Sequence, residues 1–324
     1  MDAGELRAGG YLSRPEQLVR VGEYQDTSTG LGRVLNVALH GGLQANIHLD
    51  RGIDIGDTWY KGQLISWVSP TREADALQKP SDFQWLERFN GGLVVTCGLE
   101  NVGAPIDGHG LHGTYSHRRG TDINYRREIM PDRVIFELTG TVSELRIFGR
   151  RIIVYRAIRL ESSLSGAKIT VSDRIVNEGL EPEPVAILYH VNLGAPLNLP
   201  GTKVAVNSKS YAPREEHADI HTPEVIGESL DYETEAVYEY LGFEGSAGEA
   251  TVSNSGSHTV KVKWDRENLP LFFQWIYPSK GGWALGLEPS NAPMWGSERE
   301  SEGRGMRILQ SGEDFETRVD IEIE

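Results

Sequence analysis

The stretch Phe315-Glu-Thr-Arg-Val-Asp-Ile-Glu-Ile-Glu324 alternates apolar and charged residues with a period of two. Successive side chains of an extended chain point to opposite faces, so this period predicts a β-strand with one buried face and one face in water. The expected buried face consists of Phe315, Val319, Ile321 and Ile323.

The same alternation recurs along the chain, in residues 168–176, 260–265 and 134–138. Residues 151–160 carry apolar side chains on both faces, which is typical of a more central strand. Helical patterns are scarce, and 37 glycines and 15 prolines suit many short strands joined by tight turns. We therefore predict an all-β fold, a large antiparallel β-sandwich with a few short helices.

One helix is expected in residues 80–90, because Ser81 and Gln84 have the spacing of a helix cap and two glycines follow. Its expected buried face consists of Phe83, Leu86 and Phe89. Residues 246–258 are rich in glycine and serine and are expected to form a long hairpin loop. Residues 212–235 are polar and acidic and are expected to leave the sandwich. Since no stretch resembles a linker, the 324 residues are expected to form a single domain, 1–324.

Composition excludes several classes of partner. The formal net charge of −15 disfavours nucleic acid and anionic membranes, which such a chain repels. The single cysteine, Cys97, excludes an intrachain disulfide. The first residues lack the apolar core of a signal peptide, and no apolar run is long enough to span a membrane. We expect a cytoplasmic protein, a monomer or homodimer.

Three segments set polar residues among apolar ones, and such interruptions often mark sites. The first contains His109, His112 and His117 within nine positions. A metal site is one interpretation, although neither helical nor strand spacing brings two of these histidines together. His112 is followed by a glycine, Gly113, which would allow the backbone to turn close to a ligand. Alternatively, His112 only bonds a loop carbonyl.

The second segment, residues 185–194, is a hydrophobic strand that carries His190 and Asn192 near its end. Residues two apart in a strand share a face, so these two side chains point the same way. A histidine titrates near neutral pH and is suited to general acid catalysis. The alternative is a core histidine whose hydrogen bonds are satisfied by its neighbours.

In the third segment, Glu288 ends an apolar strand. Partial desolvation should raise the pKa of this carboxylate and make it a better base. Trp275 and Trp283 lie nearby in sequence and would offer flat apolar faces to a sugar ring, unless both are core residues. Glu288 would in that case pair with an arginine.

Together these segments resemble the galactose mutarotase-like superfamily, which contains the aldose 1-epimerases. The resemblance is carried by Leu111-His-Gly113, Tyr189-His-Val-Asn-Leu193 and Leu287-Glu-Pro289, in that order. It implies that His190 is the general acid, Glu288 the general base and His112 a substrate-binding residue. The implied reaction interconverts the anomers of a reducing sugar through ring opening and closure, with no metal or organic cofactor.

A further segment, Leu49-Asp-Arg-Gly-Ile-Asp-Ile-Gly56, resembles a less studied branch of the same superfamily. By this resemblance Arg51 and Asp54 are substrate-binding candidates. Asn192, which shares a strand face with His190, and Trp275, whose ring suits a sugar, are substrate-binding candidates on their own pattern. The alternative for Arg51 and Asp54 is a structural ion pair in a turn.

Two other functions remain open at this point. A sugar-binding protein could keep the sandwich without catalysis, and would then bind sugar without exchanging its anomers. Another carbohydrate isomerase, a lyase or a glycosidase could also use such a sandwich. A glycosidase would normally need two catalytic carboxylates, and Glu288 is the one good candidate. Whether the sugar is neutral or acidic is left open.

Overall fold

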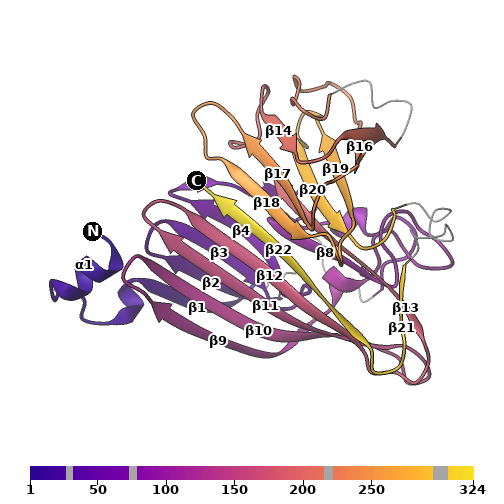
Figure 1. Cartoon of the computed structure of the whole chain (residues 1–324), viewed down its shortest axis with the longest axis horizontal. Coiled ribbons are helices and arrows are strands. Elements are labelled where there is room, and N and C mark those ends of the chain that lie inside the picture. The colour runs from indigo at the N-terminus through magenta and orange to yellow at the C-terminus, as the bar shows by residue number, and fades with distance from the viewer. Residues whose placement is uncertain (27–31, 73–78, 215–221, 295–305) are drawn as a thin grey trace.

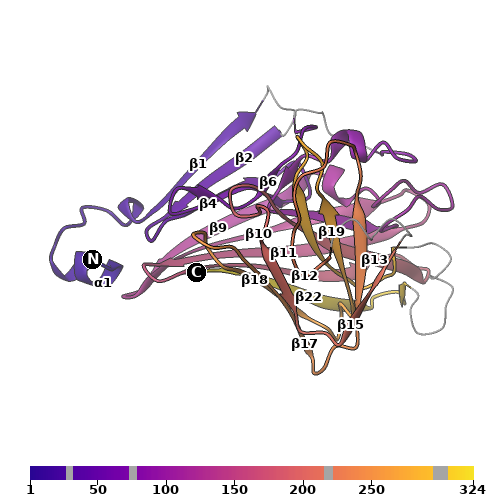
Figure 2. The same cartoon turned by 90° about the horizontal axis from the view of Figure 1, so that it is seen from above.

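The structure is a computed structural model that describes residues 1–26, 32–72, 79–214, 222–294 and 306–324. Two large antiparallel sheets dominate it and lie against each other as two layers (Figures 1 and 2). This arrangement confirms the all-β sandwich expected from the alternating pattern.

Among the described residues, the larger sheet has twelve strands, and its main path runs β1 (Val19–Asp26), β2 (Gly32–Leu39), β3 (Leu43–His48), β4 (Asp54–Tyr60), β8 (Val94–Leu99), β13 (Glu183–Leu193), β20 (Ala284–Ser290), β19 (Leu271–Tyr277), β16 (Ala236–Leu241) and β15 (Ser210–Pro213). Two short strands lie off this path: β5 (Gln63–Leu64) pairs with β4, and β21 (Arg307–Leu309) pairs with β13.

The second sheet has eight strands in the part of the chain that the structure describes, in the order β14 (Lys203–Val206), β17 (Ala247–Ser253), β18 (Val260–Asp265), β22 (Asp314–Ile323), β12 (Ala167–Asn177), β11 (Arg151–Ser163), β10 (Arg133–Leu145) and β9 (Gly120–Ile129). A two-stranded sheet joins β6 (Trp67–Val68) to β7 (Gly91–Gly92). The helices of the described residues are short: α1 (Ala3–Ala8) and the 3-10 turns η1 (Pro15–Gln17), η2 (Leu86–Arg88) and η3 (Tyr115–His117). None of them is long and apolar enough to cross a membrane.

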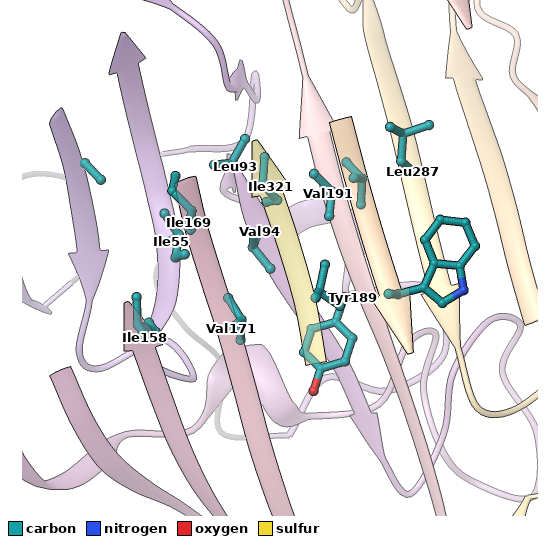
Figure 3. Packing of buried hydrophobic residues seen from close by; sticks show 14 of the residues in the cluster. Ile55, Leu93, Val94, Ile158, Ile169, Val171, Tyr189, Val191, Leu287 and Ile321 are labelled. Atoms are coloured by element: carbon teal, nitrogen blue, oxygen red, sulfur yellow. The ribbon is translucent and has the colours of Figure 1, made fainter. Parts of the chain in front are cut away.

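The strand that decided the fold class lies inside the second sheet. β22 pairs with β12 on one side and with β18 on the other, and its residues alternate between buried and more exposed as expected. Ile321 lies opposite Ile169 of β12, and Figure 3 shows both among the side chains packed between the layers. Tyr189 and Val191 of β13 enter the same core from the larger sheet.

Two local expectations are wrong. In residues 80–90 the only helical turn is η2, and the buried aromatic residues are Trp85 and Phe89, while Phe83 and Leu86 are exposed. The backbone N–H and the hydroxyl of Ser81 both donate to the side chain of Gln84, but the N-cap position of η2 is Trp85, which makes no side-chain cap bond. Residues 247–253, which were expected in a loop, form β17, where Gly248 packs beneath the indole of Trp264.

Candidate active site

His190 and Glu288 meet in the middle of the larger sheet. Their strands, β13 and β20, are antiparallel neighbours, and the register pairs Leu188 with Ser290 and Val191 with Leu287. This register sets His190 opposite Glu288, so that both side chains leave the sheet on the same face. Nε2 of His190 lies 3.2 Å from Oε1 of Glu288.

Gly286 provides the room for this arrangement. It lies two residues before Glu288 on β20 and pairs with Trp275 of β19. A Cβ atom at this position would lie 2.8 Å from Oε1 of Glu288 and 2.8 Å from Cε1 of His190. Any larger residue would therefore push the two groups apart, which makes Gly286 part of the site.

Burial sets the proton affinity of both groups. The side chain of His190 is 5% exposed and that of Glu288 is 1% exposed. Burial disfavours the charged forms, so it lowers the pKa of His190 from 6.5 to about 3 and raises the pKa of Glu288 well above 4.5. Burial therefore favours a neutral imidazole beside a carboxyl group that holds a proton.

Several polar atoms at this point lack hydrogen-bond partners within the part of the chain that the structure describes. They are Nδ1 of His190, Oδ1 of Asn192 and both carboxyl oxygens of Glu288, whose Oε1 atom lies 3.2 Å from Nε2 of His190 without forming a hydrogen bond to it. Unsatisfied buried polar atoms cost free energy and are rare in folded proteins. A cluster of four such atoms indicates a place where a ligand with hydroxyl groups would restore the missing bonds.

Asn192 lies on the same face of β13 as His190, as expected from their spacing. Its side-chain amide donates a 2.9 Å hydrogen bond to the backbone carbonyl of His190. Its side chain also acts against the effect of burial by raising the pKa of His190. Asn192 thus bonds to the backbone of His190 and favours the protonated form of its imidazole.

Aromatic rings close over the pair. The ring centroids of Phe89, Trp275 and Trp85 lie 5.1, 5.4 and 6.4 Å from that of His190. Trp85 and Phe89 stack on each other at 4.3 Å and flank the η2 turn. We call Trp85, Phe89 and Trp275 the aromatic cover, because their rings lie against the buried imidazole of His190.

A cavity of about 370 Å³ opens on the outer side of this cover. Phe89 and Trp275 line it, so they are shared by the cavity and by the surroundings of His190. A volume of a few hundred cubic ångströms suits a small ligand. Its lining residues are Trp67, Ser69, Pro70, Thr71, Leu86, Phe89, Glu233, Thr234, Glu235, Trp275 and Tyr277.

His112 lies beside the pair rather than in the cavity lining. Its ring centroid is 4.6 Å from that of Trp85 and 5.9 Å from that of His190. Its Nδ1 atom accepts a 3.2 Å hydrogen bond from the backbone of Gly103, close to the loop contact weighed as the alternative. Gly113 has a left-handed backbone, and it approaches the carbonyl of Gly98 rather than the ligand that was expected beside it.

Arg51 and Asp54 point in different directions. Arg51 donates hydrogen bonds to the backbone carbonyl of Arg88 at 2.6 Å and to the side chain of Asn90 at 3.3 Å. These two residues are the chain neighbours of Phe89. Arg51 therefore holds the end of the segment that carries the aromatic cover and does not line the cavity.

Asp54 lies on the other face of the larger sheet. It accepts a 2.7 Å hydrogen bond from Thr96, which sits opposite Tyr189 and so faces away from His190. Arg156 of the second sheet bonds Asp54 at 2.7 Å and Asp173 at 2.6 Å. Asp54 thus belongs to a buried ionic network that joins the two sheets, and the sheet separates it from His190 and Glu288.

The three clustered histidines occupy different surroundings. His109 lines a separate cavity with Glu100 and Arg150. Burial lowers the pKa of His117 to about 3, and the positive charges of Arg51 and Arg88 contribute to this shift. Within the described ranges, no three or more His, Cys, Asp or Glu side chains are arranged to hold a metal ion.

Several residues at the site escaped the sequence analysis. Trp85 was not singled out, and Glu233 and Glu235 were seen only as part of an acidic stretch. Gly286 carries a usable signal, because a glycine two residues before a carboxylate interrupts an otherwise apolar strand. Glu233 and Glu235 carry none, since surface carboxylates are common throughout this acidic chain.

Sequence comparison now places the chain in a family. DUF4432, a domain of unknown function, matches residues 29–323. The chain belongs to the DUF4432 family. None of the curated protein sequences matches this DUF4432 protein significantly.

Solved structures with the same fold complete the comparison. A Klebsiella pneumoniae protein, provisionally named an aldose 1-epimerase, has a TM-score of 0.79 and 21% identity, over 90% of the DUF4432 chain and 79% of its own. A galactose mutarotase-like protein from Clostridium acetobutylicum has a TM-score of 0.63 and 14% identity, over 95% and 99% of the two chains. At these identities the comparison shows that the DUF4432 protein has the galactose mutarotase-like fold.

Proposed function

We propose that this protein interconverts the anomers of a reducing sugar, in the manner of an aldose 1-epimerase, with His190 and Glu288 as the proton-transfer pair. The observation that carries the proposal is their direct contact, 3.2 Å between Nε2 and Oε1, beside a cavity of about 370 Å³. The fold, shared with galactose mutarotase-like proteins, supports the same choice of reaction. The proposal keeps the cytoplasmic location expected from the sequence.

The reaction needs one proton shared between two groups. Glu288 takes the proton of the anomeric hydroxyl while His190 gives one to the ring oxygen, and the ring C–O bond breaks to leave an open-chain aldehyde. Both oxygens are bonded to the same carbon, so two groups lying side by side reach both. After rotation about the adjacent C–C bond, the reverse transfers close the ring on the other face.

Burial by itself puts the shared proton on Glu288, so sugar binding has to move it to His190. The unpartnered oxygens of Glu288 would accept sugar hydroxyl hydrogen bonds, which stabilise the carboxylate. Asn192 also favours this transfer, because it raises the pKa of His190 and so stabilises the protonated imidazole. The aromatic cover must also shift to admit the sugar, and once closed again it would exclude water from the open-chain aldehyde.

In the substrate-binding roles, Trp275 would offer a flat face to the apolar side of the sugar ring, since it lines the cavity and contacts His190. His112, whose ring lies near that of His190, and Asn192, which bonds to the backbone of His190, would hold the pair in position. The placement of Arg51 favours a supporting role behind the aromatic cover, and that of Asp54 a structural role between the sheets.

A second candidate is a protein that binds sugar without catalysis. The closed aromatic cover favours it, because the reacting pair has little exposed surface in this structure. An aldose 1-epimerase would speed up the interconversion of the two anomers of a sugar. A protein that only binds sugar would leave the rate of this interconversion unchanged.

The test is an anomer-exchange NMR screen over reducing hexoses, pentoses, uronic sugars and sulfonated sugars. We expect at least one sugar to exchange faster than in buffer, and a Glu288→Gln preparation made in parallel to lack this activity. Binding without faster exchange for any sugar would favour the non-catalytic candidate. Equal activity of both preparations would reveal a contaminating enzyme and reject the assignment.

A further inference from the structure

The walls and the rim of the cavity differ in chemistry. Trp67, Phe89, Trp275 and Tyr277 supply aromatic walls, in which Trp67 meets Phe89 at 5.2 Å and Trp275 at 5.7 Å between ring centroids. Such surfaces suit the C–H faces of a pyranose ring. The wall by itself does not distinguish one sugar from another.

Two carboxylates stand beside these walls. Oε2 of Glu235 accepts a 2.8 Å hydrogen bond from the indole of Trp275, and Oε2 of Glu233 accepts one from the hydroxyl of Tyr277. These bonds hold each carboxylate next to a wall residue. An ionised carboxylate accepts several hydrogen bonds, so each retains capacity for donors on a ligand.

The charge of this rim is negative. Glu233 and Glu235 are the charged members of the cavity lining among the described residues. Burial is the largest cause of the raised pKa of Glu288, and the negative charge of Glu235 raises it further, more strongly than the positive charge of Arg214 lowers it. An anionic group on a ligand in the cavity would meet this field without a cation in the described lining.

We propose that Glu233 and Glu235 select neutral or amino pyranoses and reject sugars that carry a carboxylate, sulfonate or phosphate group. This inference rests on the proposed function and decides the charge class of its substrate. Sugar hydroxyl and ammonium groups donate hydrogen bonds to the two carboxylates, while an anionic substituent is repelled by them.

The test compares glucose, glucosamine and glucuronic acid, which share one ring and differ in charge. For each sugar, kcat/KM for anomer exchange is measured with the parent protein, Glu235→Gln, Glu233→Gln and the control Glu244→Gln. The control removes one charge from an exposed residue that pairs with Lys209 and does not line the cavity. Circular dichroism confirms that each variant is folded.

In the parent protein we expect kcat/KM for glucose and for glucosamine to exceed kcat/KM for glucuronic acid by on the order of tenfold or more. This is the size of effect expected for one pair of like charges that is partly screened by solvent. Glu235→Gln should reduce this ratio by on the order of tenfold, and added salt should reduce it in the parent. Glu244→Gln should leave both the ratio and the activity unchanged.

A parent protein that prefers the uronate, or a ratio equally unaffected by Glu235→Gln and Glu244→Gln, would overturn the charge selection while leaving the exchange activity standing. If no sugar exchanges at all, the proposed function fails and this inference fails with it.

Discussion

The ring centroid of Phe89 lies 5.1 Å from that of His190, and this contact closes the site on the side of the cavity. Phe89 is 6% exposed, whereas Phe83 in the same segment is 61% exposed. One segment thus offers a buried ring over the reacting pair and a matched ring in solvent.

Replacing Phe89 should expose the imidazole to water. In Phe89→Ala we expect the pKa of His190 to rise from about 3 towards its ordinary value of 6.5, because water stabilises the charged form. NMR titration of the imidazole hydrogens measures this change. Phe89→Leu provides a milder variant if the alanine protein is unstable, and Phe83→Ala is the control. An unchanged pKa of His190 in both Phe89 variants would mean that Phe89 does not seal the site.

Removing either member of the pair should abolish most of the activity. Glu288→Gln and His190→Asn are expected to lower the rate of anomer exchange about 10²–10⁴-fold each, the usual contribution of a proton-transfer group. Because the two groups act as one unit, the double variant should lose little more than either single variant. Circular dichroism and thermal unfolding confirm folding, and exchange at the parent rate in either variant would end the assignment.

The same pair should shape the pH dependence of stability. Glu288 has a raised pKa in the folded state, so its contribution is complete below the ordinary value of 4.5 and is lost as the pH rises. His190 has a lowered pKa, so its contribution is complete above 6.5 and is lost as the pH falls towards 3. Between pH 4.5 and 6.5 the loss of stability from Glu288 and the gain from His190 cancel as the pH rises. The stability of the protein should therefore be nearly constant in this range.

A His190→Gln, Glu288→Gln double variant removes both titrations. Relative to it, the parent protein should lose stability above pH ~6.5 and below pH ~4.5, by up to about 1.4 kcal/mol for each pH unit. Thermal unfolding of both proteins from pH 4 to 9 measures the difference. Parallel curves over the whole range would show that the pair does not titrate as its burial predicts.

The ionic network under the site should matter for folding rather than for sugar binding. Arg156→Met leaves the buried carboxylates of Asp54 and Asp173 without their shared cation, and we expect a loss of about 3–5 kcal/mol in the free energy of unfolding. Arg126→Met breaks an exposed pair with Glu137 and should cost about 0–1 kcal/mol. Urea unfolding compares the two. Equal losses would contradict a structural role of the network.

Much of the fold follows from local patterns that the sequence carries by itself. The alternation in residues 315–324 depends only on the geometry of an extended chain, so it determined both the strand and its buried face. The shared face of His190 and Asn192 is local in the same way. The glycine- and serine-rich β17 was missed, because small residues weaken the hydrophobic pattern on which such predictions rely.

The tertiary structure decided which distant residues meet. His190 faces Glu288 only because β13 pairs with β20 in one particular register, and strand pairing depends on contacts that no local pattern contains. For the same reason the sequence did not separate Asp54 from the site, since its partner Arg156 comes from the other sheet. Burial of Trp85 and Phe89 in place of Phe83 was likewise set by the packing of their segment over the larger sheet.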